Sequence, residues 1–158
     1  MKNKLIIITS WLLVLLTMII IFNFSSQNSV QSTQVSEGVV VEILSIVMDK
    51  EEITPPVVQK YQFSIRKMAH FGIYMLLGFC MLNAFYNSIM LKFWLNFLIS
   101  TLCCIAYAAL DEYHQSFSDG RVTAAIDVLI DSVGAIVGAG LFTLFILLYS
   151  KYLNKSRT

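Results

Sequence analysis

Residues 5–24 contain no charged side chain, and this uncharged run constrains the fold more than any other feature of the chain. An α-helix rises about 1.5 Å per residue, so about 20 apolar residues cross the roughly 30 Å hydrocarbon core of a bilayer. Charged residues make up 13% of the chain, against about 25% in a typical soluble domain. The sequence therefore predicts an integral membrane protein.

Three further apolar runs are long enough to span a membrane. We predict transmembrane helices at about residues 5–24, 66–86, 93–113 and 122–149, within a single domain over residues 1–158. Lys2 and Lys4 precede the first run, as in a signal peptide, but the run exceeds the usual h-region and no A-x-A-like site follows. We therefore expect a retained anchor. The predicted fold class is an all-α membrane protein, a bundle of four transmembrane helices.

The long connection, residues 25–65, contains a different helical pattern. Apolar residues recur in it at helical spacing, at Val35, Val39, Ile43, Ile46 and Val47. With acidic residues between them, they predict an amphipathic helix that lies on the membrane surface or over the bundle. Pro55 and Pro56 indicate a turn before the second span.

Basic residues near the helix ends indicate the orientation of the chain. With four spans, both termini share one side of the membrane. The basic residues are nearly balanced between the two sides, but the tail 151–157 and the amino-terminal lysines have no acidic neighbours, whereas the long connection carries five carboxylates. We expect cytoplasmic termini and an extracytoplasmic connection.

Polar and ionisable residues gather at the predicted outer ends of three spans. Counting about 20 residues along each span places them at one depth, and on each helix they are three or four residues apart, so they share a face. A charge that faces lipid costs about 2.5–3.5 kcal/mol, so these stripes should face one another or water. The candidate site residues are Arg66, Lys67, His70, Tyr74, Asp111, Glu112, His114, Gln115, Arg121, Asp127 and Asp131.

Structural roles are the alternative for these residues. Arg66, Lys67 and Arg121 fit ordinary interfacial or capping positions, and a salt bridge such as Arg66 with Asp111 would satisfy the cluster without a ligand. Gly134 and Gly138 form a G-x-x-x-G pair, which we interpret as close helix packing only.

Four ordered motifs resemble the VanZ-like family. Residues 66–78 match its R-K-x-x-H-F-x-x-Y-x-x-L-G signature, residues 111–121 its D-E-x-x-Q-x-F-x-x-G-R motif, and residues 127–134 its D-V-x-x-N/D-x-x-G motif. Residues 25–27, after the first span, resemble its F-S-S-Q element. Position 131, an aspartate here, is often asparagine in this pattern. The resemblance covers nearly the whole chain. It implies a small multi-pass protein of the bacterial cell membrane, in a family named for a teicoplanin-resistance protein.

Three functions stay open on this evidence. The first is a non-enzymatic envelope protein that contributes to teicoplanin resistance and whose outward-facing polar pocket binds a lipid headgroup, an anionic lipid or a cell-wall precursor. The second is an intramembrane enzyme acting on a lipid-linked phosphate or another envelope precursor, since His, Asp and Glu are acid–base and cation-binding residue types. Transport ranks last, because few polar residues continue the path inward. No metal-type cysteine spacing is present, the net charge of +1 suggests no nucleic-acid partner, and the cofactor and the oligomeric state stay open.

Overall fold

The computed structural model describes residues 3–26, 29–117 and 124–155. Its helices are α1 (Lys4–Ser25), α2 (Ser29–Val47), α3 (Pro55–Ser88), α4 (Phe93–Gln115) and α5 (Ala125–Lys155), with a 3-10 turn at Lys50–Glu52. No strand occurs in the described part of the chain. α1, α3, α4 and α5 are long and apolar enough to cross a membrane. The predicted all-α fold with four spans is confirmed.

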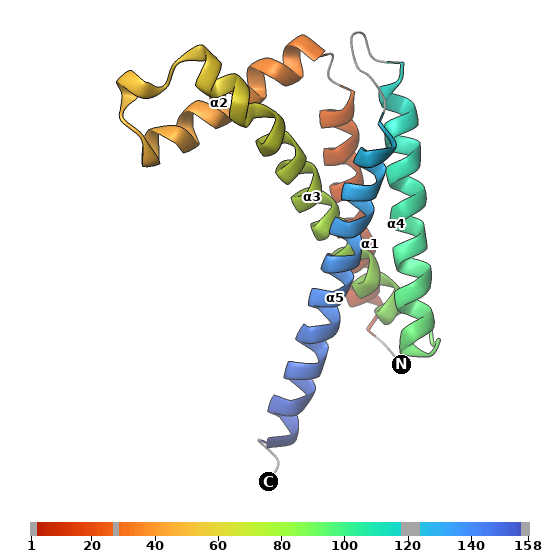
Figure 1. Ribbon diagram of the computed structural model, residues 1–158. Coiled ribbons are helices and arrows are strands. Elements are labelled where there is room, and N and C mark those ends of the chain that lie inside the picture. Colours follow the sequence, from red (N-terminus) through yellow and green to blue (C-terminus); the bar gives the residue numbers. More distant parts are fainter. Residues whose placement is uncertain (1–2, 27–28, 118–123, 156–158) are drawn as a thin grey trace.

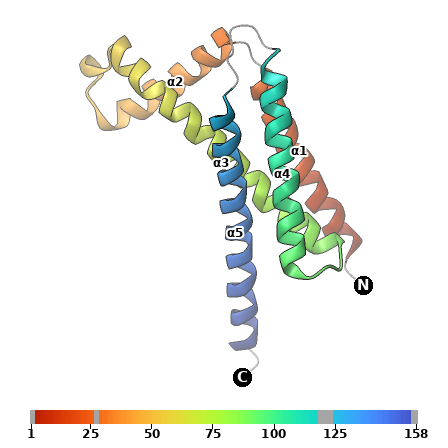
Figure 2. The same ribbon diagram turned by 45° about the vertical axis from the view of Figure 1, so that its right-hand side comes forward.

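α3 packs most extensively on α5, and it also contacts α1, α4 and α2. Figures 1 and 2 show the two chain ends at one end of the bundle and α2 at the opposite end. There α2 and the first turns of α3 form an arm that projects sideways from the bundle. The outer faces of the spans carry exposed leucine, isoleucine and phenylalanine side chains, as contact with lipid chains requires.

The helix that contains the second predicted span begins before that span. α3 starts at Pro55, not near residue 66, so Pro55 and Pro56 occupy its first turn and do not form a separate turn. Proline is favoured there because the first helical N–H groups have no partner within the helix. With 34 residues, α3 is about 50 Å long, so its amino-terminal part lies in the arm. The last helix also extends beyond its predicted span: α5 continues past residue 149 to Lys155.

The predicted helix of the long connection is present as α2, but the face that packs is a different one. Val40 and Leu44 are buried and pack with Val58 of α3. The predicted apolar stripe stays exposed instead, at Val35, Val39, Ile43, Ile46 and Val47. α2 is apolar on more than one side, and periodicity alone does not tell which side meets protein and which meets lipid.

Small residues allow α3 and α5 to approach closely. A Cβ atom added at Gly138 would overlap the carbonyl oxygen of Met75, and one added at Gly78 would overlap that of Ala135. A Cβ atom added at Gly134 would lie 2.5 Å from the carbonyl oxygen of Phe71, which is also too close. The packing interpretation of the G-x-x-x-G pair is therefore confirmed, with α3 as the partner helix. This close contact sets the register in which the polar residues of α3 and α5 meet.

Candidate functional site

Charged residues of α3 and α5 meet at the end of the bundle that carries α2. Lys67 forms an ion pair with Asp127, and both side chains are partly buried. One turn further into the bundle, His70 Nδ1 lies 3.8 Å from Asp131 Oδ2. The two contacts follow from the i, i+3 spacing on α3 and the i, i+4 spacing on α5, which place each pair on one face of its helix.

Two carboxylates lie in the protein interior behind His70. Asp111 of α4 is 5% exposed and Asp131 of α5 is 3% exposed. Gln115 Nε2 donates a hydrogen bond of 3.0 Å to Asp111 Oδ2, and the hydroxyls of Ser25 and Tyr74 lie beside the same carboxylate. Asp131 Oδ1 is buried without a hydrogen-bond partner. These residues form what we call the buried polar cluster, with Asp111, Gln115, Asp131, Ser25 and Tyr74 as members.

The other residues of the α4 motif point elsewhere. Glu112 is also buried, and its Oε1 accepts a hydrogen bond of 2.7 Å from the backbone N–H of Ala124, directly before α5 begins. His114 lies against the ring of Phe22 of α1, with ring centroids 4.9 Å apart. Glu112 therefore caps α5, and His114 packs on α1 and takes no part in the buried polar cluster.

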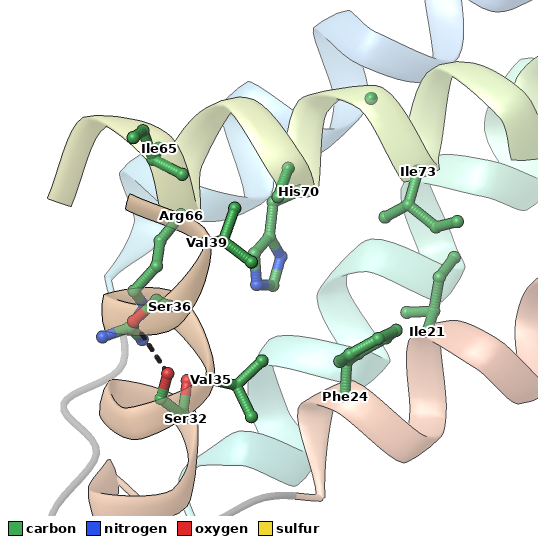
Figure 3. Close-up of a pocket in the computed structure, with 12 residues that line it drawn as sticks. Ile21, Phe24, Ser32, Val35, Ser36, Val39, Ile65, Arg66, His70 and Ile73 are labelled. Carbon is green, nitrogen blue, oxygen red and sulfur yellow. Dashed lines mark hydrogen bonds between the residues drawn. The ribbon is translucent and has the colours of Figure 1, made fainter. Parts of the chain in front are cut away.

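A cavity of about 460 Å³ lies between the end of α1, α2 and α3. Its lining is mostly apolar, and four polar residues contribute to it: Ser32, Ser36, Arg66 and His70. Figure 3 shows Arg66, Ser32 and Ser36 gathered at one side and Ile21, Phe24 and Ile73 at the other, with His70 between them. The cavity has the volume and the few convergent polar groups that are usual for a small-molecule site.

The polar side of the cavity is held in place by a contact between the arm helices. Gln62 Nε2 donates to the carbonyl oxygen of Thr33 at 3.0 Å and to Ser36 Oγ at 2.9 Å. Ser36 Oγ in turn donates to the carbonyl oxygen of Ser32, the dashed line of Figure 3. These bonds fix α2 against α3 where the guanidinium of Arg66 lies.

Arg66 and Lys67 are adjacent in sequence but differ in their surroundings. Lys67 points toward α5 and is paired with Asp127. Arg66 lines the cavity, with its guanidinium beside Ser36 at one edge (Figure 3), and it forms no ion pair with any residue of the described ranges. The salt bridge between Arg66 and Asp111 considered from the sequence does not form.

The structure thus divides the predicted residues into groups. Arg66 and His70 line the cavity, Lys67 and Asp127 form the ion pair, and the buried polar cluster lies behind His70. Arg121 lies outside the described residues. The sequence interpretation missed Gln62, Ser32 and Ser36. Gln62 stands four residues before Arg66 on the same helical stripe, which is the signal that could have found it.

The described side chains can bind anions, form hydrogen bonds and exchange protons. In the described part of the chain, no three His, Cys, Asp or Glu side chains converge as a metal-ion site would require.

Four spanning helices, a cavity under an arm and a buried polar cluster define a small multi-pass helical membrane protein. The chain belongs to the VanZ/LLP1 family, whose model matches residues 10–147. No curated protein and no solved structure matches the chain.

Proposed function

We propose that this protein captures an anionic ligand of the bacterial envelope, a lipid headgroup or a cell-wall-related anion, in the cavity between α1, α2 and α3. The observation that carries this proposal is Arg66, a cation that lines an otherwise mostly apolar cavity and has no acidic partner among the described residues. A guanidinium can bind a phosphate or a carboxylate through two parallel hydrogen bonds. The bound anion would replace the missing partner.

The neighbouring groups support a binding role for Arg66 in particular. Lys67 is already neutralised by Asp127. The hydroxyl group of Ser32 lies on the Arg66 side of the cavity and could donate a hydrogen bond to an anionic oxygen, whereas the Ser36 hydroxyl already donates to the carbonyl oxygen of Ser32. No bond in the ligand has to break for this function, which needs only the convergence of charge that the cavity provides.

The wider proposal concerns the location and the phenotype. We place the single domain in the bacterial cell membrane with both termini in the cytoplasm and the cavity outside. The basic tail, free of acidic neighbours, supports this orientation. Retention of a lipid or a cell-wall precursor at the outer face would be a route to glycopeptide resistance, and we extend the family's link with teicoplanin to this chain as part of the proposal.

The test compares binding of an anionic lipid by two arginine variants and one matched control. The full chain is purified into nanodiscs of phosphatidylcholine, and phosphatidic acid is titrated in at two salt concentrations. Arg66→Ala should weaken capture at least tenfold, because a charge-assisted hydrogen bond contributes about 1.5–3 kcal/mol and about 1.4 kcal/mol is tenfold. Arg66→Lys should retain part of the binding.

Lys60→Ala is the control, since Lys60 is an exposed cation on the same helix that does not line the cavity. It should bind phosphatidic acid as the wild type does. Equal capture by the wild type and Arg66→Ala would overturn the proposal. For the phenotype, teicoplanin susceptibility of cells expressing the wild type is compared with that of cells expressing Arg66→Ala at matched membrane abundance.

One observation favours a second candidate, an intramembrane enzyme that acts on a lipid-linked phosphate. His70 lines the cavity, and its Nδ1 faces the buried Asp131, so its Nε2 is the nitrogen available to a ligand. A carboxylate that is hydrogen-bonded to an imidazole orients it for proton transfer, so this candidate requires the 3.8 Å distance between His70 and Asp131 to shorten when the substrate binds. Under this candidate, the purified protein converts a lipid-linked phosphate in the nanodisc, and His70→Asn abolishes conversion while phosphatidic acid binding persists. If the substrate stays intact after prolonged incubation, the enzyme candidate is excluded and only the binding function remains.

A further inference from the structure

We propose that the cavity holds the hydrocarbon chain of the ligand, so that the ligand is a membrane amphiphile and not a soluble anion. This inference rests on the proposed function and adds to it the chemical class of the ligand. The anionic group would lie at Arg66, and the chain would run beside α3 toward Ile73. Three features of the cavity carry the inference.

The first feature is the polarity of the cavity along α3. Arg66 stands at one end and Ile73 at the other, seven residues or about 10 Å further along the helix. Ile21 and Phe24 of α1 face the Ile73 end. An inorganic anion would use the Arg66 end only and would leave an apolar space unfilled. A ligand with a charged head and an apolar tail matches both ends.

The second feature is the wall that faces outward. Phe24, Val35 and Val39 line the cavity, yet these residues are 53%, 48% and 44% exposed. The cavity is therefore continuous with the outer apolar surface of α1 and α2. In a bilayer that surface contacts lipid chains, and a chain can pass from the leaflet into the cavity without crossing a polar layer.

The third feature is Gly72, which lines the cavity. A Cβ atom added at Gly72 would meet no atom within 4 Å. This differs from Gly78 and Gly138, where an added Cβ would overlap the backbone of a neighbouring helix. Gly72 is therefore not required for helix packing, and its missing side chain leaves the space that a hydrocarbon chain would fill.

The experiment maps where a lipid tail contacts the protein. The full chain in phosphatidylcholine nanodiscs is exposed to phosphatidic acid that carries a diazirine in one acyl chain, and the photolabelled peptides are identified by mass spectrometry. We expect the label to concentrate on the peptides that contain Val35, Val39 and Ile73. Gly72→Leu fills the cavity and should reduce this labelling at least fivefold.

Two matched controls accompany the cavity variants. Gly140→Leu introduces the same side chain at a position where an added Cβ also meets no atom within 4 Å, but on α5, away from the cavity. Val39→Trp places a bulky side chain on the cavity wall. Its control, Val41→Trp, places the same side chain at a residue of α2 that has nearly the same exposure and does not line the cavity. The two controls, Gly140→Leu and Val41→Trp, should be labelled as the wild type is.

The outcomes separate this inference from the proposed function. If Arg66→Ala lowers labelling while Gly72→Leu and Val39→Trp do not, the anion binds but the chain lies elsewhere, and the inference is overturned. If the cavity variants lower labelling and Arg66→Ala does not, the chain site stands and the anion proposal fails. Glycerol 3-phosphate should compete at least tenfold less well than lysophosphatidic acid; equal competition would show that the chain adds nothing and would overturn the inference.

Discussion

His70 lies between the cavity and the protein interior, with its Nδ1 3.8 Å from Asp131 Oδ2 and its ring on the cavity wall. This distance is beyond hydrogen-bond range. Asp131 Oδ1 has no hydrogen-bond partner either, and the second buried carboxylate, Asp111, belongs to the same buried polar cluster. The single imidazole thus stands between two buried carboxylates and any ligand in the cavity.

The first prediction concerns the charge of Asp131. We expect Asp131→Asn to keep the free energy of unfolding within about 1 kcal/mol of the wild-type value, because the carboxylate forms no close ion pair whose loss would leave a buried charge. The measurement is thermal unfolding of the detergent-solubilised protein. A loss of about 3–5 kcal/mol, the cost of breaking a buried ion pair, would mean that His70 and Asp131 are both charged and tightly paired.

The second prediction concerns the contact between Glu112 and Ala124. Glu112 Oε1 accepts the N–H of Ala124, and its negative charge lies at the amino-terminal end of α5, where it interacts favourably with the helix dipole. Glu112→Ala should lower the free energy of unfolding by about 1–2 kcal/mol. Glu112→Gln retains an acceptor oxygen and should lose less. Glu42→Ala, an exposed carboxylate on α2, is the control; if it destabilises as much as Glu112→Ala, the cap is not the cause.

The spans and the shared depth of the polar residues could be predicted from the sequence, because both depend on length. A run of about 20 apolar residues has the length of a membrane-spanning helix. Counting residues along it gives the depth of each side chain in the bilayer without knowledge of the packing. The Lys67–Asp127 and His70–Asp131 contacts between α3 and α5 follow from that shared depth together with the glycines of α5.

The features that the sequence did not predict depend on which neighbouring helix each helix face contacts. Arg66 and Lys67 look equivalent in sequence, but a rotation of about 100° per residue turns Lys67 to α5 and Arg66 to α2. The turn predicted at Pro55 and Pro56 is instead the first turn of α3, because this pair is compatible both with a separate turn and with a first helical turn. The cavity could be predicted only from the position of α2, and the valines of α2 are compatible with more than one packing face.

The third prediction uses the glycines of α5 as a matched pair. At Gly138 an added Cβ would overlap the backbone of α3, and at Gly140 it would meet nothing within 4 Å. Gly138→Ala should therefore destabilise the protein by about 3 kcal/mol or more. Gly140→Ala should be neutral or slightly stabilising, since alanine has the higher helix propensity. Equal thermal midpoints for the two variants would contradict the close α3–α5 contact.

The fourth prediction concerns the opposite end of the bundle. Ser10 Oγ of α1 accepts hydrogen bonds from the side-chain amides of Asn83 at 3.1 Å and Asn87 at 3.4 Å on α3. Ser10→Ala removes this acceptor, and we expect a loss of about 1 kcal/mol in thermal unfolding, since interhelical hydrogen bonds in membranes average about 0.6 kcal/mol each. Thr9→Val is the control, because the Thr9 hydroxyl bonds only to carbonyls of its own helix. A larger loss in Thr9→Val would exclude the interhelical bonds as the cause.

The fifth prediction tests the orientation of the chain. Glu51 lies in the 3-10 turn of the arm and Asn154 at the end of α5, and both are exposed. The arm and the carboxyl terminus lie at opposite ends of the bundle, so one reagent must reach them from opposite sides of the membrane. A membrane-impermeant maleimide should label Glu51→Cys in intact cells and Asn154→Cys only after permeabilisation. The wild-type chain supplies the blank, because Cys80 and Cys104 are buried and Cys103 lies within the α4 span. Labelling of Asn154→Cys alone in intact cells would put the arm in the cytoplasm, where the cavity would meet the lipids of the inner leaflet and could not retain an extracytoplasmic precursor.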